Sequence, residues 1–242
     1  MNPTPIFPKC YKKSSKPHKY CPGCGHGIAL KELGYAIDEL GIAKKTVLGF
    51  DIGCSLLAWD FFDVNSVQTH HGRTVPVMSG YKLVDAKKVC LAYVGDGGGY
   101  AIGLQSLITA AQRNDAITVI LVNNTIYGMT GGQTAPTTFS NEKTTTSPNG
   151  RKCWESGQPF MGPEIIKSLN NLNSFVARAS VKDPIQLRQI IKQAINNQIN
   201  KDSFSFVEVL STCPTNWHMN AKESLNRLNN QIAKQFPVGV FK

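Results

Sequence analysis

The chain has 242 residues, enough for one domain with a sizeable core, and no run approaches the ~20 apolar residues of a membrane span. It carries 26 Lys and Arg against 16 Asp and Glu, a formal charge of +10, which favours acidic partners of any class without choosing between them. The odd count of seven cysteines and the absence of an apolar leader argue against a disulfide framework, so we expect a cytoplasmic protein.

The first part of the chain divides into an arm, a cysteine pair, a helix and a strand. Prolines interrupt residues 1–20, which we expect to form an extended arm. Residues 28–40 repeat apolar side chains at helical spacing, and residues 46–50 are typical of a buried strand. Residues 60–80 hold a His-His-Gly-Arg cluster and have no clear periodicity. The basic character of the arm comes from Lys9, Lys12, Lys13, Lys16 and Lys19.

The clearest pattern is a strand, a glycine-rich loop, a helix and a second strand. Residues 89–94 form an apolar run that ends at a Gly-Asp-Gly-Gly-Gly loop. Residues 101–113 carry apolar side chains on one helical face, and residues 117–122 form a β-branched run that ends at two asparagines. Such a unit pairs its strands in parallel through a right-handed crossover.

The remaining sequence continues this alternation after a long loop. Residues 128–163 are rich in Gly, Thr, Pro and Ser, and such a loop in a compact domain is usually a lid, a ligand loop or an interface. We expect strands over residues 175–179 and 204–210 and a helix over residues 184–198. From Ala221 the chain is helical in pattern and then ends in Phe-Pro-Val-Gly-Val-Phe-Lys.

These elements predict a single α/β domain over residues 1–242, with a mostly parallel sheet flanked by helices. The basic N-terminal arm (1–20) and a C-terminal tail (about 218–242) lie outside its alternating pattern.

Polar residues follow two neighbouring strands of this sheet. Asp96 and Asn124 are 28 positions apart (124 − 96), and both fall at the carboxyl ends of strands, where open parallel sheets bind ligands. Glycines beside Asp96 let the main chain approach a diphosphate. A carboxylate, an amide oxygen and a main-chain carbonyl are ligands that Mg²⁺ accepts beside phosphate oxygens. The alternative is a glycine-rich turn and a polar strand end without a ligand.

Four cysteines are candidates for a metal site. Cys21 and Cys24 have the two-residue gap of a metal-binding pair, and Cys54 and Cys213 each follow a predicted strand. The residues alone leave a redox pair, a zinc site, an iron–sulfur cluster and plain core cysteines open. Cys90, inside an apolar run, is expected to be a core residue, and Cys10 and Cys153 have no evident partner.

Six segments together resemble the β subunits of 2-oxoacid:ferredoxin oxidoreductases, in particular the 2-oxoisovalerate/2-oxoglutarate branch. They are YCPGCGHG (20–27), IGCS (52–55), HGR (71–73), GDGGGYAIG (95–103), NNTIYGMTGGQTAPTT (123–138) and STCPTNW (211–217). The resemblance implies a thiamine-diphosphate-binding fold, thiamine diphosphate, Mg²⁺ and a 4Fe–4S cluster.

The resemblance also implies roles for individual residues. Mg²⁺ would be held by Asp96, Asn124 and the carbonyl of Ile126. The cluster would be held by Cys21, Cys24, Cys54 and Cys213. His71 would face the cofactor or substrate with Arg73 nearby as the catalytic pair, although Arg73 could instead serve a salt bridge to a partner. The cofactor pocket would be lined by Gly53, Cys54, Ser55, His71, Gly95, Asp96, Gly97, Asn124, Ile126, Tyr127, Gly128, Met129 and Thr130.

The implied reaction is oxidative decarboxylation of a 2-oxoacid, with coenzyme A taking the acyl group and ferredoxin the electrons. No Glu lies in a recognisable site motif, so a partner α subunit would supply the Glu that activates the aminopyrimidine, and small ferredoxin-like subunits could accompany it. The chain alone would then be inactive. The apolar residues 55–59 after Cys54 favour a branched-chain or small 2-oxoacid. Neither nucleic acid nor a membrane is expected as a partner.

Two other functions remain open. A non-redox thiamine-dependent decarboxylase or synthase subunit would use Asp96 and Asn124 but would leave the four cysteines without a role. A zinc-bound nucleic-acid-binding protein would use the basic arm and the cysteine pair, but the aromatic residues are not interleaved with basic ones as that function requires.

Overall fold

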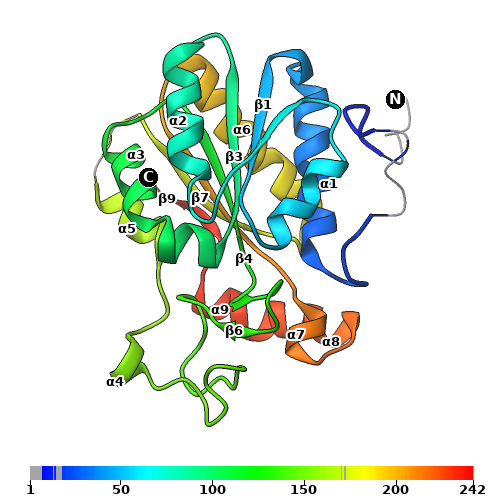
Figure 1. Cartoon of the computed structure of the whole chain (residues 1–242), viewed down its shortest axis with the longest axis vertical. Coiled ribbons are helices and arrows are strands. Elements are labelled where there is room, and N and C mark those ends of the chain that lie inside the picture. Colours follow the sequence, from blue (N-terminus) through cyan, green and yellow to red (C-terminus); the bar gives the residue numbers. More distant parts are fainter. Residues whose placement is uncertain (1–6, 13, 15–17, 170, 172, 242) are drawn as a thin grey trace.

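A seven-stranded sheet forms the centre of the computed structural model, which describes residues 7–12, 14, 18–169, 171 and 173–241 (Figure 1). Its strand order is β2-β1-β3-β4-β8-β7-β9, and β9 pairs antiparallel with β7 while the other pairs are parallel. A two-stranded sheet pairs β5 with β6. The strands are β1 (Thr46–Phe50), β2 (Asn65–Gln68), β3 (Val89–Gly95), β4 (Thr118–Asn123), β5 (Ile126–Tyr127), β6 (Gln133–Thr134), β7 (Phe175–Ser180), β8 (Ser205–Leu210) and β9 (Gly239–Phe241).

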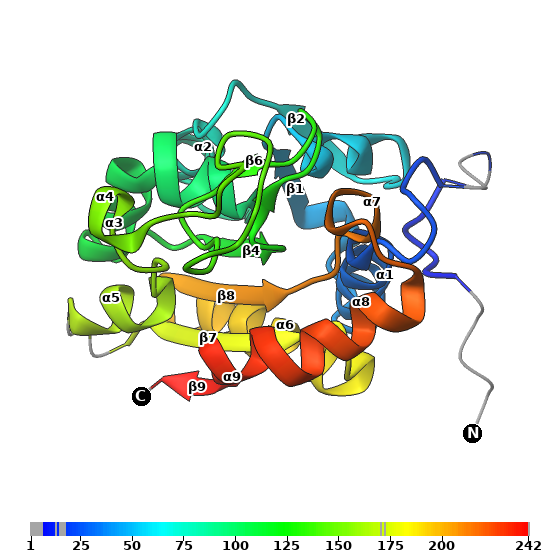
Figure 2. The same ribbon diagram turned by 90° about the horizontal axis from the view of Figure 1, so that it is seen from below.

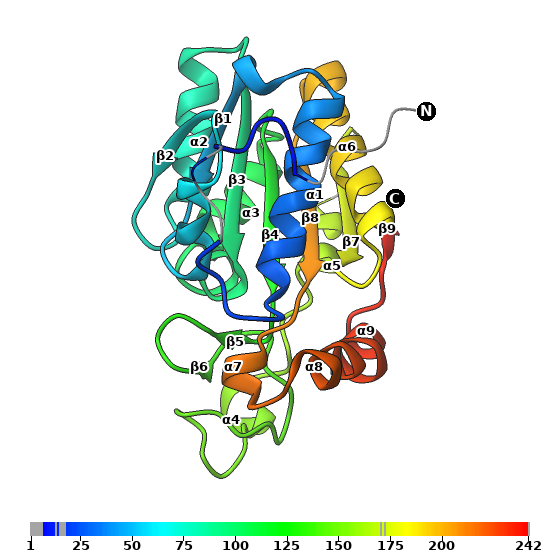
Figure 3. The same cartoon turned by 90° about the vertical axis from the view of Figure 1, so that its right-hand side faces the viewer.

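Helices cover both faces of the large sheet. One core lies beneath α1 and α6, and a second lies beneath α2, α3 and α5 (Figures 1 and 3). Along β3, Leu91 and Tyr93 belong to the first core, whereas Cys90 and Ala92 belong to the second, so this strand is apolar on both faces as a buried parallel strand must be. The helices are α1 (Gly25–Glu39), α2 (Thr74–Val84), α3 (Leu104–Gln112), α5 (Gly162–Ser168) and α6 (Pro184–Lys201).

Loops and short helices form a layer beyond the carboxyl ends of the parallel strands. Figure 2 looks onto this end, with the β5–β6 loops on the side of β1 and β2 and the last helices on the side of β7. The short elements include two single turns of π-helix, η3 and η4. Their bounds are η2 (Cys54–Asp60), η3 (Gly98–Ile102), α4 (Cys153–Ser156), α7 (Pro214–Trp217), α8 (Ala221–Arg227), η4 (Leu228–Ile232) and α9 (Ala233–Gln235). A further short helix, η1 (Ala43–Lys45), lies instead at the amino end of β1.

The predicted fold class, a mostly parallel α/β sheet flanked by helices, is confirmed. The strands predicted from apolar runs are present with bounds that differ by at most about one residue, because both of their faces are buried. The first helix begins at Gly25, three residues earlier than the apolar period indicated, because Gly25 follows the cysteine turn directly and its N–H bonds to Thr212 O at 3.1 Å.

Other expectations were wrong or incomplete. Residues 60–80, expected to be aperiodic, contain the exposed edge strand β2 and most of α2; an exposed edge strand has no apolar alternation to detect. The loop 128–163 contains β6 and α4. The C-terminal helix was predicted, but β9, three residues long, was not.

The part of the N-terminal arm that the structure describes packs against the domain. Cys10 is buried, its N–H bonds to Asp38 Oδ1 at 3.0 Å, and Tyr11 pairs with Phe62. Residues 7–12 therefore pack against α1 and the segment before β2, which a proline-rich sequence does not indicate. Lys13 and Lys16, two of the five lysines of the predicted basic arm, lie outside the described residues.

Candidate active site

A cavity of about 370 Å³ opens at the carboxyl ends of β1, β3 and β4. Every residue that was predicted to line the cofactor pocket lies on it. Those residues are Gly53, Cys54, Ser55, His71, Gly95, Asp96, Gly97, Asn124, Ile126, Tyr127, Gly128, Met129 and Thr130. Four further residues that the sequence did not single out also line it: His26, Ile52, Gly98 and Ile102.

Asp96 is the buried acid of this cavity. Its Oδ1 accepts a hydrogen bond from the Gly97 N–H at 2.9 Å, and its Oδ2 accepts one from Thr137 Oγ1 at 2.5 Å. Burial raises the pKa of Asp96 to about 7, and Glu208 contributes to the rise. No Lys or Arg pairs with Asp96 in the described part of the chain. A buried carboxylate without a cationic partner is the kind of group that a metal ion stabilises.

A tight turn at the end of β4 presents Asn124. Thr125 has φ +61°, in the left-handed region, and its N–H bonds to Asn123 Oδ1 at 3.1 Å. The Ile126 N–H bonds to Asn124 Oδ1 at 3.2 Å. Because β3 and β4 are adjacent and parallel, with Gly95 opposite Val122, Asp96 and Asn124 lie at the same edge of the sheet.

Glycines let the main chain form one wall of the cavity. A Cβ on Gly97 would lie 2.0 Å from the Tyr127 ring, and one on Gly98 would lie 1.7 Å from Asp51 Oδ2. A side chain at either position would collide with these groups unless they moved, so glycine keeps the main chain of this loop open to the cavity at Gly97 and Gly98. That is the surface a diphosphate requires.

The four candidate cysteines gather beside this cavity. The sulfur atoms of Cys54 and Cys213 both lie next to Gly128, where an added Cβ would be 3.2 and 3.5 Å from them. The loop that holds Cys21 and Cys24 is tied to the strand-end segment before Cys213, because Thr212 Oγ1 donates to Gly23 O at 2.7 Å. Burial raises the pKa of both Cys24 and Cys54 to about 12, and the charges of neighbouring cysteines add to both shifts.

These thiols do not meet at a single point. Within residues 7–12, 14, 18–169, 171 and 173–241, no three His, Cys, Asp or Glu side chains are arranged to hold one metal ion. The sulfurs are therefore grouped in one region without forming a mononuclear site. Cys90 is buried in the second core, as predicted, and Cys10 is buried with its Sγ 3.4 Å from Gly34 O.

Comparison with known proteins identifies the family. Residues 51–209 match the family described as "Thiamine pyrophosphate enzyme, C-terminal TPP binding domain". The ketoisovalerate oxidoreductase subunit VorA of Methanothermobacter thermautotrophicus is 42% identical over 92% of this chain and 47% of its own length. The 2-oxoglutarate synthase subunit KorB of Methanocaldococcus jannaschii is 37% identical over 86% of this chain and 73% of its own length. The chain belongs to the thiamine-diphosphate-binding subunits of the 2-oxoacid:ferredoxin oxidoreductases.

A solved structure agrees with this family. The 2-oxoglutarate:ferredoxin oxidoreductase from Magnetococcus marinus, solved with 2-oxoglutarate, coenzyme A and succinyl-CoA bound, has a TM-score of 0.80 and 26% identity. The match covers 99% of this chain and 86% of that one. The chain nevertheless spans about half the length of the VorA relative, 47%. In the described part of this thiamine-diphosphate-binding subunit, no helix is long and apolar enough to cross a membrane.

The two residues predicted to be catalytic lie in different places. His71 lines the cavity, and the turn that carries it is held by a 2.8 Å hydrogen bond from the Gly72 N–H to Asp51 Oδ1. Arg73 is exposed, precedes α2 and is not among the residues that line the cavity. The structure thus brings His71 but not Arg73 to the site, and an exposed Arg73 suits the alternative role at a partner surface.

His26 is the site residue that sequence reasoning missed most clearly. It is buried, its Nδ1 lies 2.8 Å from Tyr93 OH, and its ring stacks on Tyr20 at 5.1 Å. Burial lowers the pKa of His26 to about 4, so its imidazole is neutral near pH 7. Its position two residues after Cys24, in the first turn of α1, was the available signal.

Proposed function

We propose that this subunit provides the diphosphate half of a thiamine site and an adjoining iron–sulfur cluster in a 2-oxoacid:ferredoxin oxidoreductase. The reaction is the decarboxylation of a 2-oxoacid, with transfer of the acyl group to coenzyme A and of electrons to ferredoxin. The observation that carries this proposal is the juxtaposition of Asp96 and Asn124 on one cavity whose wall also includes Cys54.

Mg²⁺ and the diphosphate fit the polar end of the cavity. Asp96 and Asn124 would supply side-chain oxygens and Ile126 a carbonyl, an oxygen set that suits Mg²⁺. A bound cation would also offset the cost of burying the Asp96 charge. Thiamine diphosphate, when bound, supplies the electron sink for decarboxylation. The role of this chain is to hold its diphosphate end and to keep His71 at the same cavity.

The cysteine region is where we place the proposed iron–sulfur cluster. Cys21, Cys24, Cys54 and Cys213 lie close enough to influence the pKa values of Cys24 and Cys54, and cysteine thiolates are the usual ligands of iron–sulfur clusters. The cluster would supply a one-electron path away from the thiamine site. Cys54 belongs to both regions, so that path would be short. A non-redox thiamine enzyme would give the four thiols no such use.

A partner subunit would complete the site. No Glu is among the described residues that line the cavity, whereas activation of the aminopyrimidine requires one. Ile102 and Met129 are 56% and 47% exposed at the cavity, an apolar rim that a partner would cover. We therefore propose an α subunit that supplies the Glu, with ferredoxin as electron acceptor, in a complex that could also contain small ferredoxin-like subunits.

The substrate we propose is a branched-chain 2-oxoacid. No Lys or Arg belongs to the described lining of the cavity, so nothing in this chain would pair with the distal carboxylate of 2-oxoglutarate. The VorA relative is named a ketoisovalerate oxidoreductase. The alternative substrate, 2-oxoglutarate, is named for the KorB relative and for the Magnetococcus marinus structure.

The test is to purify the chain with its partner without oxygen and to measure viologen or ferredoxin reduction with coenzyme A. A panel of 2-oxoisovalerate, pyruvate and 2-oxoglutarate distinguishes the substrates. We expect reduction to depend on the 2-oxoacid, on thiamine diphosphate and on the partner, with 2-oxoisovalerate fastest. Full turnover by the isolated chain, or no 2-oxoacid-dependent reduction by the complex, would contradict the proposal.

A further inference from the structure

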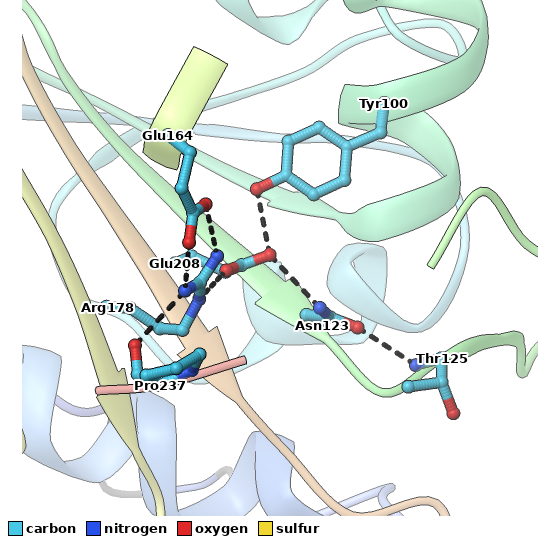
Figure 4. A network of polar contacts seen from close by, with 7 residues as sticks. All are labelled: Tyr100, Asn123, Thr125, Glu164, Arg178, Glu208 and Pro237. Carbon is cyan, nitrogen blue, oxygen red and sulfur yellow. Dashed lines mark hydrogen bonds and ion pairs between the residues drawn. The ribbon is translucent and has the colours of Figure 1, made fainter. Parts of the chain in front are cut away.

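Glu208, on β8, is a fully buried acid that no sequence motif marks (Figure 4). Its Oε1 accepts hydrogen bonds from Tyr100 OH at 2.9 Å and from Asn123 Nδ2 at 3.0 Å. Its Oε2 accepts one from Arg178 Nε. The Glu208 carboxylate thus joins one residue each from η3, β4 and β7.

The two groups on Oε1 belong to the two loops of the cofactor site. Tyr100 lies in η3, directly after the Gly-Asp-Gly segment that contains Asp96. Asn123 directly precedes Asn124, and its Oδ1 accepts the Thr125 N–H that closes the left-handed turn. Figure 4 shows this path from Glu208 through Asn123 to Thr125. One oxygen atom therefore links the loop of Asp96 to the loop of Asn124.

Arg178 fixes the other side of Glu208. Its Nη1 and Nη2 donate to Glu164 at 2.8 and 2.7 Å, and Nη1 also donates to Pro237 O at 3.1 Å. Its guanidinium lies 5.4 Å from the ring of Phe236 and 5.3 Å from that of Phe241. These contacts anchor the buried Arg178 side chain in the core, and Arg178 in turn anchors the Glu208 carboxylate.

We infer that Glu208 is a positioning residue of the Mg²⁺–diphosphate site, which sets the separation between Asp96 and Asn124 without touching either ligand. This inference rests on the proposed function. A purely structural role predicts a different outcome: loss of the network would lower stability and leave metal binding unchanged. Measuring both the free energy of unfolding and the Mg²⁺ affinity of the same variants therefore distinguishes the two roles.

The variants are Tyr100→Phe, which removes one hydrogen bond from Oε1, and Glu208→Gln, which also removes the charge that pairs with Arg178. The matched control is Thr118→Val. Thr118 lies on the same strand as Asn123 but at its other end, and its buried hydroxyl donates to Gln198 Oε1 at 2.8 Å. The control thus removes one buried hydrogen bond far from the site.

Each variant is purified in its complex and stripped of metal with a chelator. Calorimetry then follows the titration with Mg²⁺ at a fixed concentration of thiamine diphosphate. Unfolding in urea gives the free energy of unfolding of the same variants. We expect the Mg²⁺ concentration for half-maximal binding to rise about threefold in Tyr100→Phe and about tenfold in Glu208→Gln, and to stay unchanged in Thr118→Val.

Reduced stability with an unchanged Mg²⁺ midpoint in Tyr100→Phe would overturn the inference while leaving the proposed function intact. If Glu208→Gln does not fold, the milder Tyr100→Phe decides alone. Failure of the wild-type complex to bind thiamine diphosphate in a Mg²⁺-dependent manner would refute the proposed function itself.

Discussion

The polar end of the cavity and the cysteine region lie side by side but differ in how far the chain alone organises them. Asp96 and Asn124 are held by hydrogen bonds within the chain and stand on rigid strand ends. Cys21 and Cys24 lie in a loop, and Cys21 is exposed. Strand ends can prepare a site before its ligand arrives, whereas loops leave the final arrangement to the ligand.

The largest effect that this difference predicts is at Asp96. Asp96→Asn removes the carboxylate that we propose as the anionic Mg²⁺ ligand and should lower Mg²⁺-dependent binding of thiamine diphosphate more than about 100-fold, because no other Asp or Glu is among the described residues that line the cavity. Iron content should stay near that of the wild type. Calorimetry and iron analysis of the anaerobic complex check both results. Asp202→Asn, an exposed change at a left-handed position that Asn also tolerates, should alter neither.

A substitution in the cysteine region should have the reverse effect to Asp96→Asn: iron is lost and the binding of thiamine diphosphate is retained. Cys24→Ser should remove most of the iron and visible absorbance and abolish ferredoxin reduction, while Mg²⁺-dependent binding of thiamine diphosphate persists. Cys90→Ala is the control, because Cys90 is a buried core thiol; it should keep the iron and lose only about 1 kcal/mol of stability. Iron retained in Cys24→Ser would remove this cysteine from the cluster.

Features of the fold and the site that depend on residues close together in the sequence could be predicted, whereas contacts between distant residues could not. The apolar runs of β1, β3 and β4, and the polar residues that follow them, are local patterns, so the fold class and the place of Asp96 and Asn124 at strand ends could be predicted. The other residues of the cavity lining were named from the family resemblance. Thr137, which bonds to Asp96, and Glu208, which bonds to Asn123, are 41 and 85 positions away from those partners. Only tertiary packing brings them to the site, so the sequence pattern did not reveal them.

Some elements and residues could not be predicted because they lack a pattern of their own in the sequence and are defined by the parts of the fold around them. β2 is an exposed edge strand and β9 has three residues, so neither has a detectable alternation. His26 was overlooked because its significance comes from Tyr20 and Tyr93, which enclose it. Arg73, in contrast, was associated with the site through the resemblance of the HGR segment (71–73) to the family, and the structure does not bring it to the cavity.

We expect a moderate dependence of Mg²⁺ affinity on pH. Because the pKa of Asp96 is about 7 without metal, a proton competes with Mg²⁺ below that pH. Mg²⁺ affinity should rise about tenfold per pH unit from pH 5.5 to 6.5 and level off above pH 7.5. Calorimetry at these pH values tests this, and a flat profile would contradict the buried, uncompensated carboxylate.

Stability without metal should change with pH in the opposite direction. Since folding raises the pKa of Asp96 above its usual value, its stabilising contribution is complete below about pH 4 and is lost as the pH rises through about 7. The free energy of unfolding from urea titrations should therefore fall over this range. Asp96→Asn should flatten the fall, and saturating Mg²⁺ with thiamine diphosphate should remove it.

The smallest effect is expected at Thr137. Thr137→Val removes the hydroxyl that donates to Asp96 Oδ2 but leaves the carboxylate in place. Mg²⁺ affinity at pH 6.5 should fall about threefold, because the loss of this donor raises the pKa of Asp96 further. At pH 8 the difference from the wild type should be smaller. An equal loss at both pH values would assign Thr137 a packing role only.

Crystals of the anaerobically purified complex, grown with thiamine diphosphate and Mg²⁺ and measured at the iron absorption edge, test the two regions together. We predict anomalous density for iron among Cys21, Cys24, Cys54 and Cys213, and diphosphate density between Asp96 and Asn124. Diphosphate density elsewhere in the complex, with no ligand density beside Asp96 and Asn124, would contradict the account.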